Sequence, residues 1–483
     1  MANPSVPRLL LPITLTVTLG GFLFGYATAV ISGTVSSLHA FFIEPLQLGE
    51  GAMNSFLGFV VSSALLGCVV GGFLGGWVSR RLGRKQGLVI SAALFLISAL
   101  GSAMPEFPAA PLELGTEQLV YWFIFYRVIG GVGIGMASML SPLYIAEIAP
   151  AERRGQLVSL NQFAIVTGIL IVYFVNYSIA SGGDERWLTE QGWRWMFASE
   201  AIPALVFLLA LFFIPDTPRS LLLRDKERDA IGVLEKLNGA AQATRLLEEI
   251  RESLRKRSGK LLSYGPKVLV LGVSLAVIQQ SVGINVVLYY APEIFKSIGG
   301  DTSAAMLQTV VVGGVNLLFT VIAIFTVDRY GRKKLMLLGG LGMAVAMIGL
   351  GFAFYASWHW LTLLTLMLLY IACFAMSWGP VTWVLLAEIF PNQIRSAAMG
   401  LAVAAMWIAN QIVSWTFPMM NDNSWLVATF NHGFTYWVYG LASLVGVLFV
   451  WRLLPETKGK TLEELEQLWT PHKTQGERSD ASR

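Results

Sequence analysis

The stretch Gly83-Arg84-Lys85 stands between two long apolar segments, and the same three residues return as Gly331-Arg332-Lys333. Two other pairs of motifs repeat at corresponding places: Ala146-Glu147-Ile148 with Ala387-Glu388-Ile389, and Pro215-Asp216-Thr217 with Pro455-Glu456-Thr457. The repetition predicts two homologous halves in one chain. Many secondary transporters are built this way, because rocking one half against the other exposes a site between them to each side of a membrane in turn.

The composition is that of an integral membrane protein. Of 483 residues, 55% are hydrophobic and only 13% are charged, which is too much apolar surface for water-soluble domains of this size. A helix needs roughly 20 apolar residues to cross the hydrocarbon core. Windows of this length predict an all-α membrane protein with twelve transmembrane helices. The windows are 10–32, 54–77, 86–104, 119–142, 158–180, 195–214, 268–290, 303–327, 334–356, 361–386, 396–420 and 432–454.

A polar stretch divides the predicted helices into two groups of six. We predict an N-terminal six-helix half at 1–214, a cytoplasmic helical linker at 215–267, a C-terminal six-helix half at 268–454 and a cytoplasmic tail at 455–483. Apolar residues recur at helical spacing in the linker, which predicts amphipathic helices there. The linker is either a latch that packs on the bundle in one conformation or a solvated tether.

Lys and Arg are concentrated in alternate loops, a pattern typical of cytoplasmic loops in membrane proteins. They follow the second, fourth and eighth predicted spans and are absent from 33–53, 105–118 and 421–431. Both termini are therefore expected on the cytoplasmic side of a plasma membrane, with a bacterial inner membrane as the expected location. The net charge of +4 reflects this asymmetry and does not indicate nucleic-acid binding. The first span lacks a signal-peptide cleavage pattern, so we expect it to be retained.

Two matched sets of charged residues are predicted at the cytoplasmic helix ends. They are Arg84, Glu147 and Arg154 in the first half, and Arg332, Glu388 and Arg395 in the second. A single Arg at a helix end usually only extends to the membrane interface, whereas repetition in both halves favours a cytoplasmic gate. If the sets pair across the halves when the cytoplasmic side is closed, each ion pair forms in one state and breaks in the other.

Taken together, the motifs resemble the sugar porter family of the major facilitator superfamily over nearly the whole chain. The resemblance rests on Gly83 to Lys85, Arg127 to Gly131, Pro142 to Glu147, Pro215 to Arg219, Gln279 to Asn285, Asp328 to Arg332 and Pro455 to Gly459. It implies the major facilitator fold and alternating-access transport of a monosaccharide, either a xylose-like pentose or a glucose-like hexose. It also implies a monomer in the lipid bilayer, with a small-molecule sugar as its partner.

A sugar presents a ring of hydroxyl groups and a weakly apolar face, so its site calls for neutral amides and aromatic planes. Amides within a span are costly against lipid unless they line a polar cavity or bind one another. The resemblance assigns five residues within predicted spans to the sugar site, and three more to the pocket or its gate. The five are Gln162, Gln279, Gln280, Asn285 and Trp383, and the three are Phe24, Tyr289 and Asn316.

Two positions of the expected sugar site depart from the family pattern. Where a xylose-transporting member has glutamines, this chain has Ile169 and Met406. Each exchange removes a partner for a sugar hydroxyl and makes the wall more apolar, so the affinity or the choice of sugar is expected to differ. Ile169 resembles the residue of animal facilitative glucose transporters.

The residues expected for proton coupling are incomplete. Coupling needs an acid whose proton affinity differs between the two facing states, and a buried carboxylate beside an arginine serves this purpose. The resemblance assigns the cation to Arg127 and the acid to the position of Ala27, where proton-coupled relatives have Asp. Three alternatives follow: the protein is an uncoupled facilitator, Glu200 takes over the coupling, or an aspartate was replaced to hold one conformation. We expect proton-driven accumulation to be weakened or lost.

Other function classes fit the sequence less well. A sugar sensor with this fold is expected to carry a longer cytoplasmic extension, and a drug exporter to have a more acidic cavity with fewer amides. The spacing of histidines and cysteines suggests no metal site, and no nucleophile-base set or phosphate loop stands out, so an enzyme is not expected. No cofactor is expected, and a proton is the candidate coupling ion.

Overall fold

The computed structural model describes residues 9–107, 115–150, 153–255, 261–297, 301–391 and 393–458. Within these ranges, 12 helical segments are long and apolar enough to cross a membrane. They are Leu10–Gly33, Glu50–Arg81, Arg84–Ala103, Thr116–Ile148, Gly155–Ala180, Glu185–Phe212, Pro266–Lys296, Thr302–Val327, Arg332–Tyr355, Trp360–Ile389, Ala397–Asn421 and Gly433–Leu453. The prediction of a twelve-helix membrane protein is confirmed.

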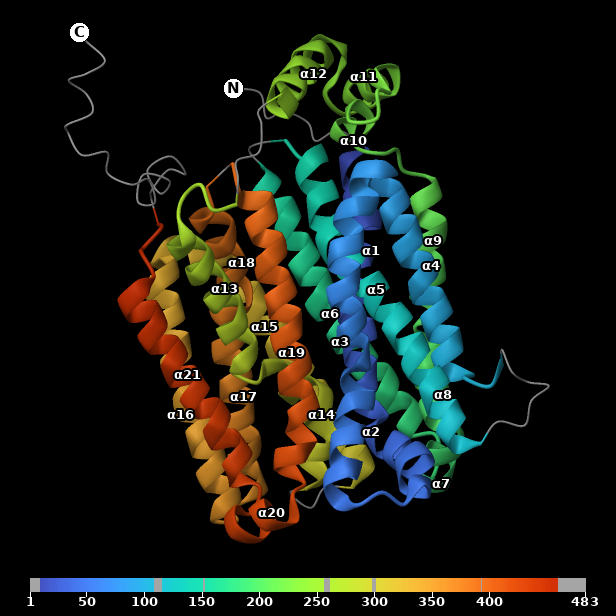
Figure 1. Ribbon diagram of the computed structural model, residues 1–483, viewed down its shortest axis with the longest axis vertical. Helices are drawn as coiled ribbons and strands as arrows, with labels where there is room; N and C mark the ends of the chain where they lie inside the picture. The colour runs from blue at the N-terminus through green and yellow to red at the C-terminus, as the bar shows by residue number, and fades with distance from the viewer. Residues whose placement is uncertain are drawn as a thin grey trace.

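The helices of each half lie together, and the two halves stand side by side (Figure 1). The first half comprises α1 (Leu10–Ala29), α2 (Val35–Leu38), α3 (Glu50–Arg81), α4 (Arg84–Ala103), α5 (Thr116–Ile148), α6 (Arg154–Ala180), α7 (Glu185–Trp187), α8 (Trp193–Ser199) and α9 (Ala201–Phe212). The second comprises α13 (Pro266–Ser281), α14 (Ile284–Lys296), α15 (Thr302–Tyr330), α16 (Arg332–Tyr355), α17 (Trp360–Met376), α18 (Trp378–Ile389), α19 (Arg395–Asn421), α20 (Ser424–Phe430) and α21 (Gly433–Leu453).

The linker forms three helices over one end of the bundle, which we call the linker end (Figure 1). They are α10 (Pro218–Leu222), α11 (Glu227–Asn238) and α12 (Ala240–Arg255). α11 buries Ala230, Val233, Leu234 and Leu237 on one face, as its amphipathic pattern predicts. The linker is attached to the first half, because Arg224 donates to the Leu82 carbonyl at 2.7 Å.

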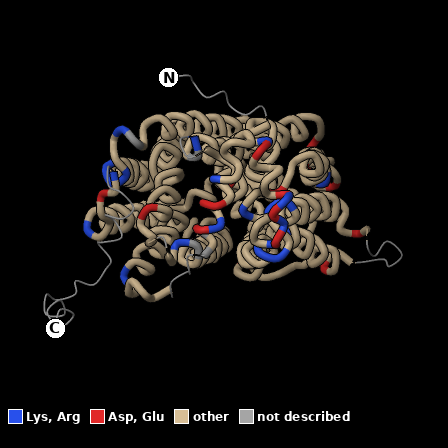
Figure 2. The backbone as a smooth tube through the Cα atoms, turned by 90° about the horizontal axis from the view of Figure 1, so that it is seen from above, with Lys and Arg blue, Asp and Glu red and all other residues tan. Residues whose placement is uncertain are grey.

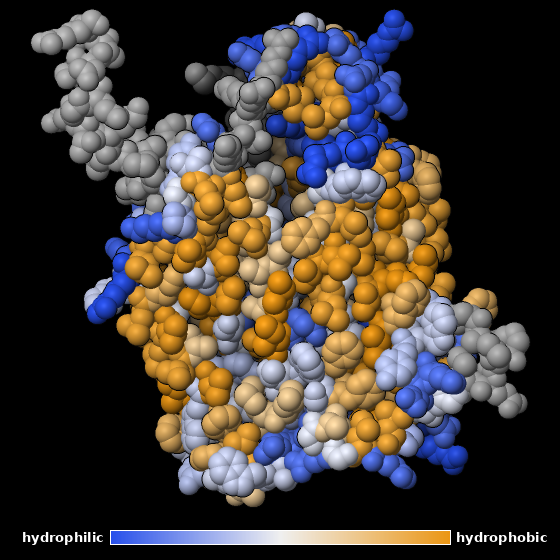
Figure 3. All heavy atoms as spheres, in the orientation of Figure 1, coloured by the Kyte–Doolittle hydropathy of each residue, from blue (hydrophilic) through white to orange (hydrophobic). Residues whose placement is uncertain are grey.

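The outer surface of the bundle has the distribution of apolar and polar residues that suits a lipid bilayer. Apolar residues cover the sides, while polar residues gather at the linker helices and at the other end, which we call the opposite end (Figure 3). Seen from the linker end, charged residues lie at helix ends and on the linker (Figure 2). Large side chains such as Phe73, Phe213 and Phe325 are exposed on the spans, which is favourable only against lipid.

Hydrogen bonds between the halves gather toward the opposite end. Their partners are Ser36 with Glu293, Asn54 with the Asp422 carbonyl, Trp415 with the Ser55 carbonyl, Gln411 with Ser62 and Tyr173 with the Leu288 carbonyl. Here α3 and α19 come so close that a Cβ on Gly58 would collide with the backbone of Trp415. The two halves are thus held together at this end in this conformation.

Candidate functional site

Three carboxamides form a continuous row at the junction between α13 and α14. Gln279 donates to the Trp378 carbonyl at 3.1 Å, and its Oε1 accepts from Nε2 of Gln280 at 3.3 Å. Asn285 then donates from Nδ2 to Oε1 of Gln280 at 2.6 Å. We call Gln279, Gln280 and Asn285 the amide row. The clustering that the sequence predicted is present, and carboxamides that both donate and accept suit a ligand with hydroxyl groups.

Two helix breaks position the amide row. Gly283 separates α13 from α14 with φ at +88°, a conformation that side chains with a Cβ rarely adopt. The second break, at Ser377, separates α17 from α18. It leaves the Trp378 and Gly379 carbonyls near Gln279, at 3.1 and 3.4 Å from its Nε2. Irregular backbone at membrane depth is tolerated where protein surrounds it or where it lines a polar cavity.

The remaining residues predicted for the sugar site lie on other helices of both halves. Phe24 on α1 meets the Trp407 ring on α19, with ring centroids 5.6 Å apart. Tyr289 and Asn316 are buried, as are the apolar replacements Ile169 and Met406. Gln162 and Trp383 are half-buried. Among the described residues no hydrogen bond joins Gln162, Asn316 or Trp383 to the amide row, so their part in the site stays a prediction.

Sequence reasoning missed two buried donors on α19. Trp407 and Asn410 are 3% and 1% exposed. The Nε1 of Trp407 has no hydrogen-bond partner within the described ranges, and the Asn410 side chain lies beside that of Tyr289. The available signal was the presence of Asn410 in an otherwise apolar span, which usually indicates helix-helix packing. The missing partner of its Nε1 sets Trp407 apart from such packing groups.

The arginine expected for proton coupling is buried without a carboxylate against it. Arg127 is 3% exposed; it donates to the backbone carbonyl of Ala27 at 3.3 Å and lies over the Phe197 ring at 5.3 Å. Glu200, 1% exposed, is near enough to attract it electrostatically but forms no direct ion pair with it. Nε of Arg127 and Oε1 of Glu200 both lack partners in the described chain. Ala27 therefore meets the guanidinium through its backbone carbonyl.

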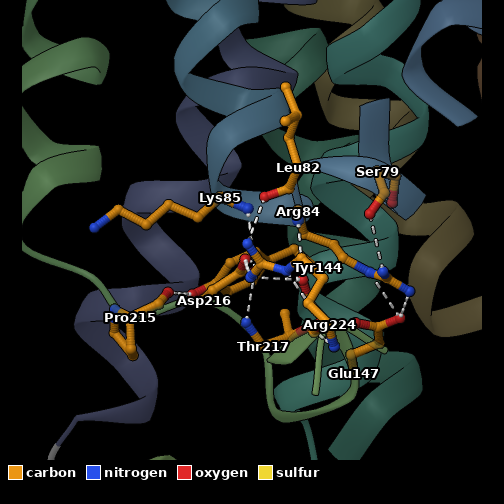
Figure 4. Close-up of polar contacts among 11 residues, drawn as sticks. Ser79, Leu82, Arg84, Lys85, Tyr144, Glu147, Pro215, Asp216, Thr217 and Arg224 are labelled. Atoms are coloured by element: carbon orange, nitrogen blue, oxygen red, sulfur yellow. Dashed lines mark hydrogen bonds and ion pairs between the residues drawn. The ribbon is translucent and has the colours of Figure 1, made fainter. Parts of the chain in front are cut away.

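The charged residues predicted for a gate lie at the linker end, and each half pairs its own. Arg84, at the start of α4, donates to Glu147 near the end of α5, with Nη2 and Oε1 2.8 Å apart (Figure 4). Arg332 repeats this with Glu388 at 3.1 Å. The pairs form inside the halves and not across them, because α4 packs on α5 and α16 on α18. Pairing across the halves in a closed state stays a prediction.

The two other arginines of the predicted gate differ in what the structure shows. Arg395 donates from Nε to the Phe390 carbonyl at 3.1 Å. This bond ties the start of α19 to the end of α18. The side chain of Arg154 lies outside the described residues.

The repeated motifs after the sixth and twelfth spans act alike in the two halves. Asp216 accepts from the backbone N–H of Lys85 at 3.2 Å, and Glu456 accepts from those of Arg332 and Lys333, each at 3.2 Å. A carboxylate at a helix N-terminus satisfies free N–H groups and favours the helix dipole. In the first half, Arg224 adds an ion pair with Asp216 at 2.5 Å (Figure 4).

A cavity of about 800 Å³ opens between the halves at the opposite end. α14 runs from the amide row to this cavity, where Glu293 and Lys296 meet Ser36 of the first half at 2.6 Å each. The lining is polar and rich in acidic side chains, including Glu50 and Asp422. None of the amide-row residues lines this cavity.

A family model described as "Sugar (and other) transporter" matches residues 13–469. The chain belongs to the sugar transporter family. Sugar transporters with curated names include the D-xylose-proton symporter of Escherichia coli, which is 57% identical over 468 residues that cover 95% of each chain. The glucose facilitated diffusion protein of Zymomonas mobilis is 42% identical over 98% of this chain and all of that one.

Solved structures of the sugar transporter family carry the same fold. The inward open conformation of the E. coli xylose transporter superposes with a TM-score of 0.86 at 53% identity, covering 95% of this chain and 100% of that one. The structure of the same transporter bound to 6-bromo-6-deoxy-D-glucose gives 0.82. The major facilitator fold, the resemblance to the sugar porter family and the expectation of a transporter family in place of an enzyme family are thus confirmed.

Proposed function

We propose that this protein carries a monosaccharide, xylose or glucose, across a bacterial inner membrane by alternating access. The observation that carries the proposal is the amide row, three linked carboxamides at membrane depth beside two helix breaks. Relatives named for xylose and glucose transport support the sugar class. The Phe24 ring and the Trp407 ring add the aromatic surface that a sugar ring prefers.

The linker end faces the cytoplasm in this proposal, with both termini on that side. Lys and Arg flank the helices there, as in the loops around Arg84 and Arg332, and cytoplasmic loops carry such an excess. The hydrogen bonds between the halves close the opposite end. Similarity to an inward open transporter structure supports the same orientation. The conformation is therefore the one that releases sugar into the cell, and the chain works as a monomer.

The protein is further proposed to move sugar without coupling to protons. Ala27 supplies Arg127 only with a backbone carbonyl, so no carboxylate pairs with the guanidinium directly. A second candidate is coupled transport through Glu200. The side chain of Glu200 is buried, and its Oε1 has no hydrogen-bond partner in the described chain. Such an acid can exchange a proton when the halves move.

Two assays on the purified chain in liposomes test these proposals. Counterflow of radiolabelled xylose and glucose is expected with each sugar loaded inside, and its absence for both would reject sugar transport. Proton movement during sugar influx, followed with a trapped pH dye, separates the two coupling modes. No dye response is expected, whereas a response abolished by Glu200→Gln would establish the second candidate.

A further inference from the structure

Two broken membrane spans of the second half bind each other at their breaks. Gln279 on α13 donates from Nε2 to the Trp378 carbonyl at 3.1 Å, at the break between α17 and α18. In return, Tyr370 on α17 donates its hydroxyl to the Val282 carbonyl at 2.8 Å, at the break between α13 and α14. Each span thus places a side chain on a backbone carbonyl at the break of the other, and the two bonds fix the breaks relative to each other.

The bond from Tyr370 serves a backbone group at the end of α13. This helix ends at Ser281, and the turn that follows is closed by the N–H of Gly283, which bonds to the Gln280 carbonyl at 3.0 Å. Carbonyls in the last turn of a helix lack a partner within that helix, and a buried carbonyl left without one is costly. Val282 and Tyr370 are both fully buried. The Tyr370 hydroxyl therefore supplies a partner that the helix break removes.

The geometry of this break sets the spacing of the amide row. Two members of the row precede the break and Asn285 follows it, so the 2.6 Å bond from Asn285 to Gln280 spans the break. A second tyrosine, Tyr439, packs its ring against Gly283, where a Cβ would lie 2.7 Å from the ring. Its hydroxyl has no partner in the described chain. Of these two tyrosines, Tyr370 is thus the one that holds the break by a hydrogen bond.

We infer that Tyr370 is a positioning residue for the sugar site, whose hydroxyl holds the α13–α14 break so that the carboxamides on both sides of it reach one sugar ring together. This rests on the proposed function, because the amide row is the site that it serves. Tyr370 acts through the Val282 backbone and contributes no group to the sugar. Removal of its hydroxyl leaves every member of the amide row present but lets the break relax.

The test is equilibrium binding of D-glucose and D-xylose to the purified full chain in detergent. Tyr370→Phe is expected to weaken the binding of both sugars about three- to tenfold, the range that one hydrogen bond accounts for. Tyr439→Phe is the matched control, because it removes a hydroxyl beside the same break without breaking a bond, and it is expected to bind both sugars as the wild type does.

A double variant separates positioning from general support of the fold. Gln280→Leu already breaks the amide row, so in that background Tyr370→Phe is expected to weaken binding by less than about twofold further, because two changes that act through one network are not additive. The same three- to tenfold loss in that background would overturn the inference, since packing of the bundle does not depend on the row.

A stability control completes the test. Tyr144→Phe removes a comparable bond, from a buried tyrosine hydroxyl to the Pro215 carbonyl at the linker end. Both Tyr144→Phe and Tyr370→Phe are expected to lower the melting temperature, but only Tyr370→Phe is expected to lower sugar affinity. Equal affinity losses in the two variants, or unchanged affinity in folded Tyr370→Phe, would reject this inference alone. A wild-type chain that binds neither sugar would reject the proposed function.

Discussion

At the scale of single residues, Arg127 is the clearest case of a buried charge that lacks a directly paired opposite charge. A buried cation without a carboxylate is unfavourable by several kcal/mol unless other groups compensate. The Ala27 carbonyl, the Phe197 ring and the nearby Glu200 provide only part of that compensation. Arg127 is thus a buried cation for which the described chain supplies no direct carboxylate partner.

The amide row gives the most direct prediction at this scale. Gln280 both donates to Gln279 and accepts from Asn285, so Gln280→Leu breaks the row on both sides. The affinity for glucose and xylose is expected to fall by about tenfold or more, since the buried carboxamide of Gln279 and the half-buried carboxamide of Asn285 each lose a partner. Equilibrium binding measures this, with Gln242→Leu on the exposed face of the linker as control. Unchanged affinity would show that the row is structural.

Site residues could be predicted from the sequence where their side-chain type is unusual within an apolar span. Gln279, Gln280 and Asn285 stand out in the sequence because amides are costly against lipid. Asn410 and Trp407 do not stand out in the sequence. A single polar residue in a span is usually a packing group, and tryptophan is common in membrane helices. Only the burial of both side chains and the unpaired Nε1 of Trp407 in the folded chain distinguish them.

At the scale of helices, the break at Gly283 shapes the site. Its φ of +88° lies in the left-handed region, and a Cβ there would approach the Tyr439 ring to 2.7 Å. Gly283→Ala is expected to lower the free energy of unfolding by about 1 to 3 kcal/mol. It is also expected to weaken sugar binding, because the amide row straddles the break.

Thermal unfolding in detergent measures the effect of Gly283→Ala. Gly314→Ala is the matched control, since this position on α15 has open space around it. Equal melting temperatures for both variants would contradict the strained turn.

The caps on α4 and α16 lead to a second prediction for helices. Asp216 is 8% exposed at its side chain and pairs with Arg224 at 2.5 Å. Asp216→Asn keeps the shape but removes the charge from the helix N-terminus and from the ion pair, so a loss of about 1 to 3 kcal/mol in stability is expected. Denaturation in detergent checks this, with the exposed Glu249→Gln as control. Equal stability of wild type and Asp216→Asn would argue against a capping role.

The positions of the helices could be predicted from the sequence better than the contacts between residues on different helices. The twelve windows lie within the observed spans or extend past their ends by a few residues, because a hydrophobic run of this length has few alternatives. The sequence predicted ion pairs across the halves only for a state closed at the cytoplasmic side, and it did not predict that Arg84 and Arg332 pair with a glutamate of their own half in this conformation. Charge repetition reveals matching positions but not which neighbour a side chain meets, since that depends on helix packing.

At the scale of the whole molecule, the contact between α3 and α19 holds the opposite end closed. Gly58→Val places a branched side chain against the Trp415 backbone and is expected to open this end, with slower sugar transport. The labelling assay uses a cysteine at Asn54 in a background with Cys68 and Cys373 replaced by serine. This cysteine is expected to react with a membrane-impermeant maleimide several-fold faster when Gly58→Val is added than when Gly58 is kept. Gly72→Val on the same helix, which meets nothing, is the control. Equal labelling rates would contradict this closure.

The repeat of motifs predicted the two-part architecture, and charge asymmetry predicted which end carries the linker. The facing state was not predictable, because both states use the same helices and differ only in where the halves touch. In the folded chain the contacts at Asn54, Ser62 and Trp415 join the halves at the opposite end.

In the proposed mechanism this transporter lacks the acid that would couple sugar transport to protons. The most direct measurement is uptake of radiolabelled xylose and glucose into liposomes with an inward proton gradient, comparing the wild-type chain with Ala27→Asp. We predict that the wild type only equilibrates sugar, and that Ala27→Asp, with a carboxylate beside Arg127, accumulates it. Accumulation by the wild type that a protonophore abolishes would contradict the account.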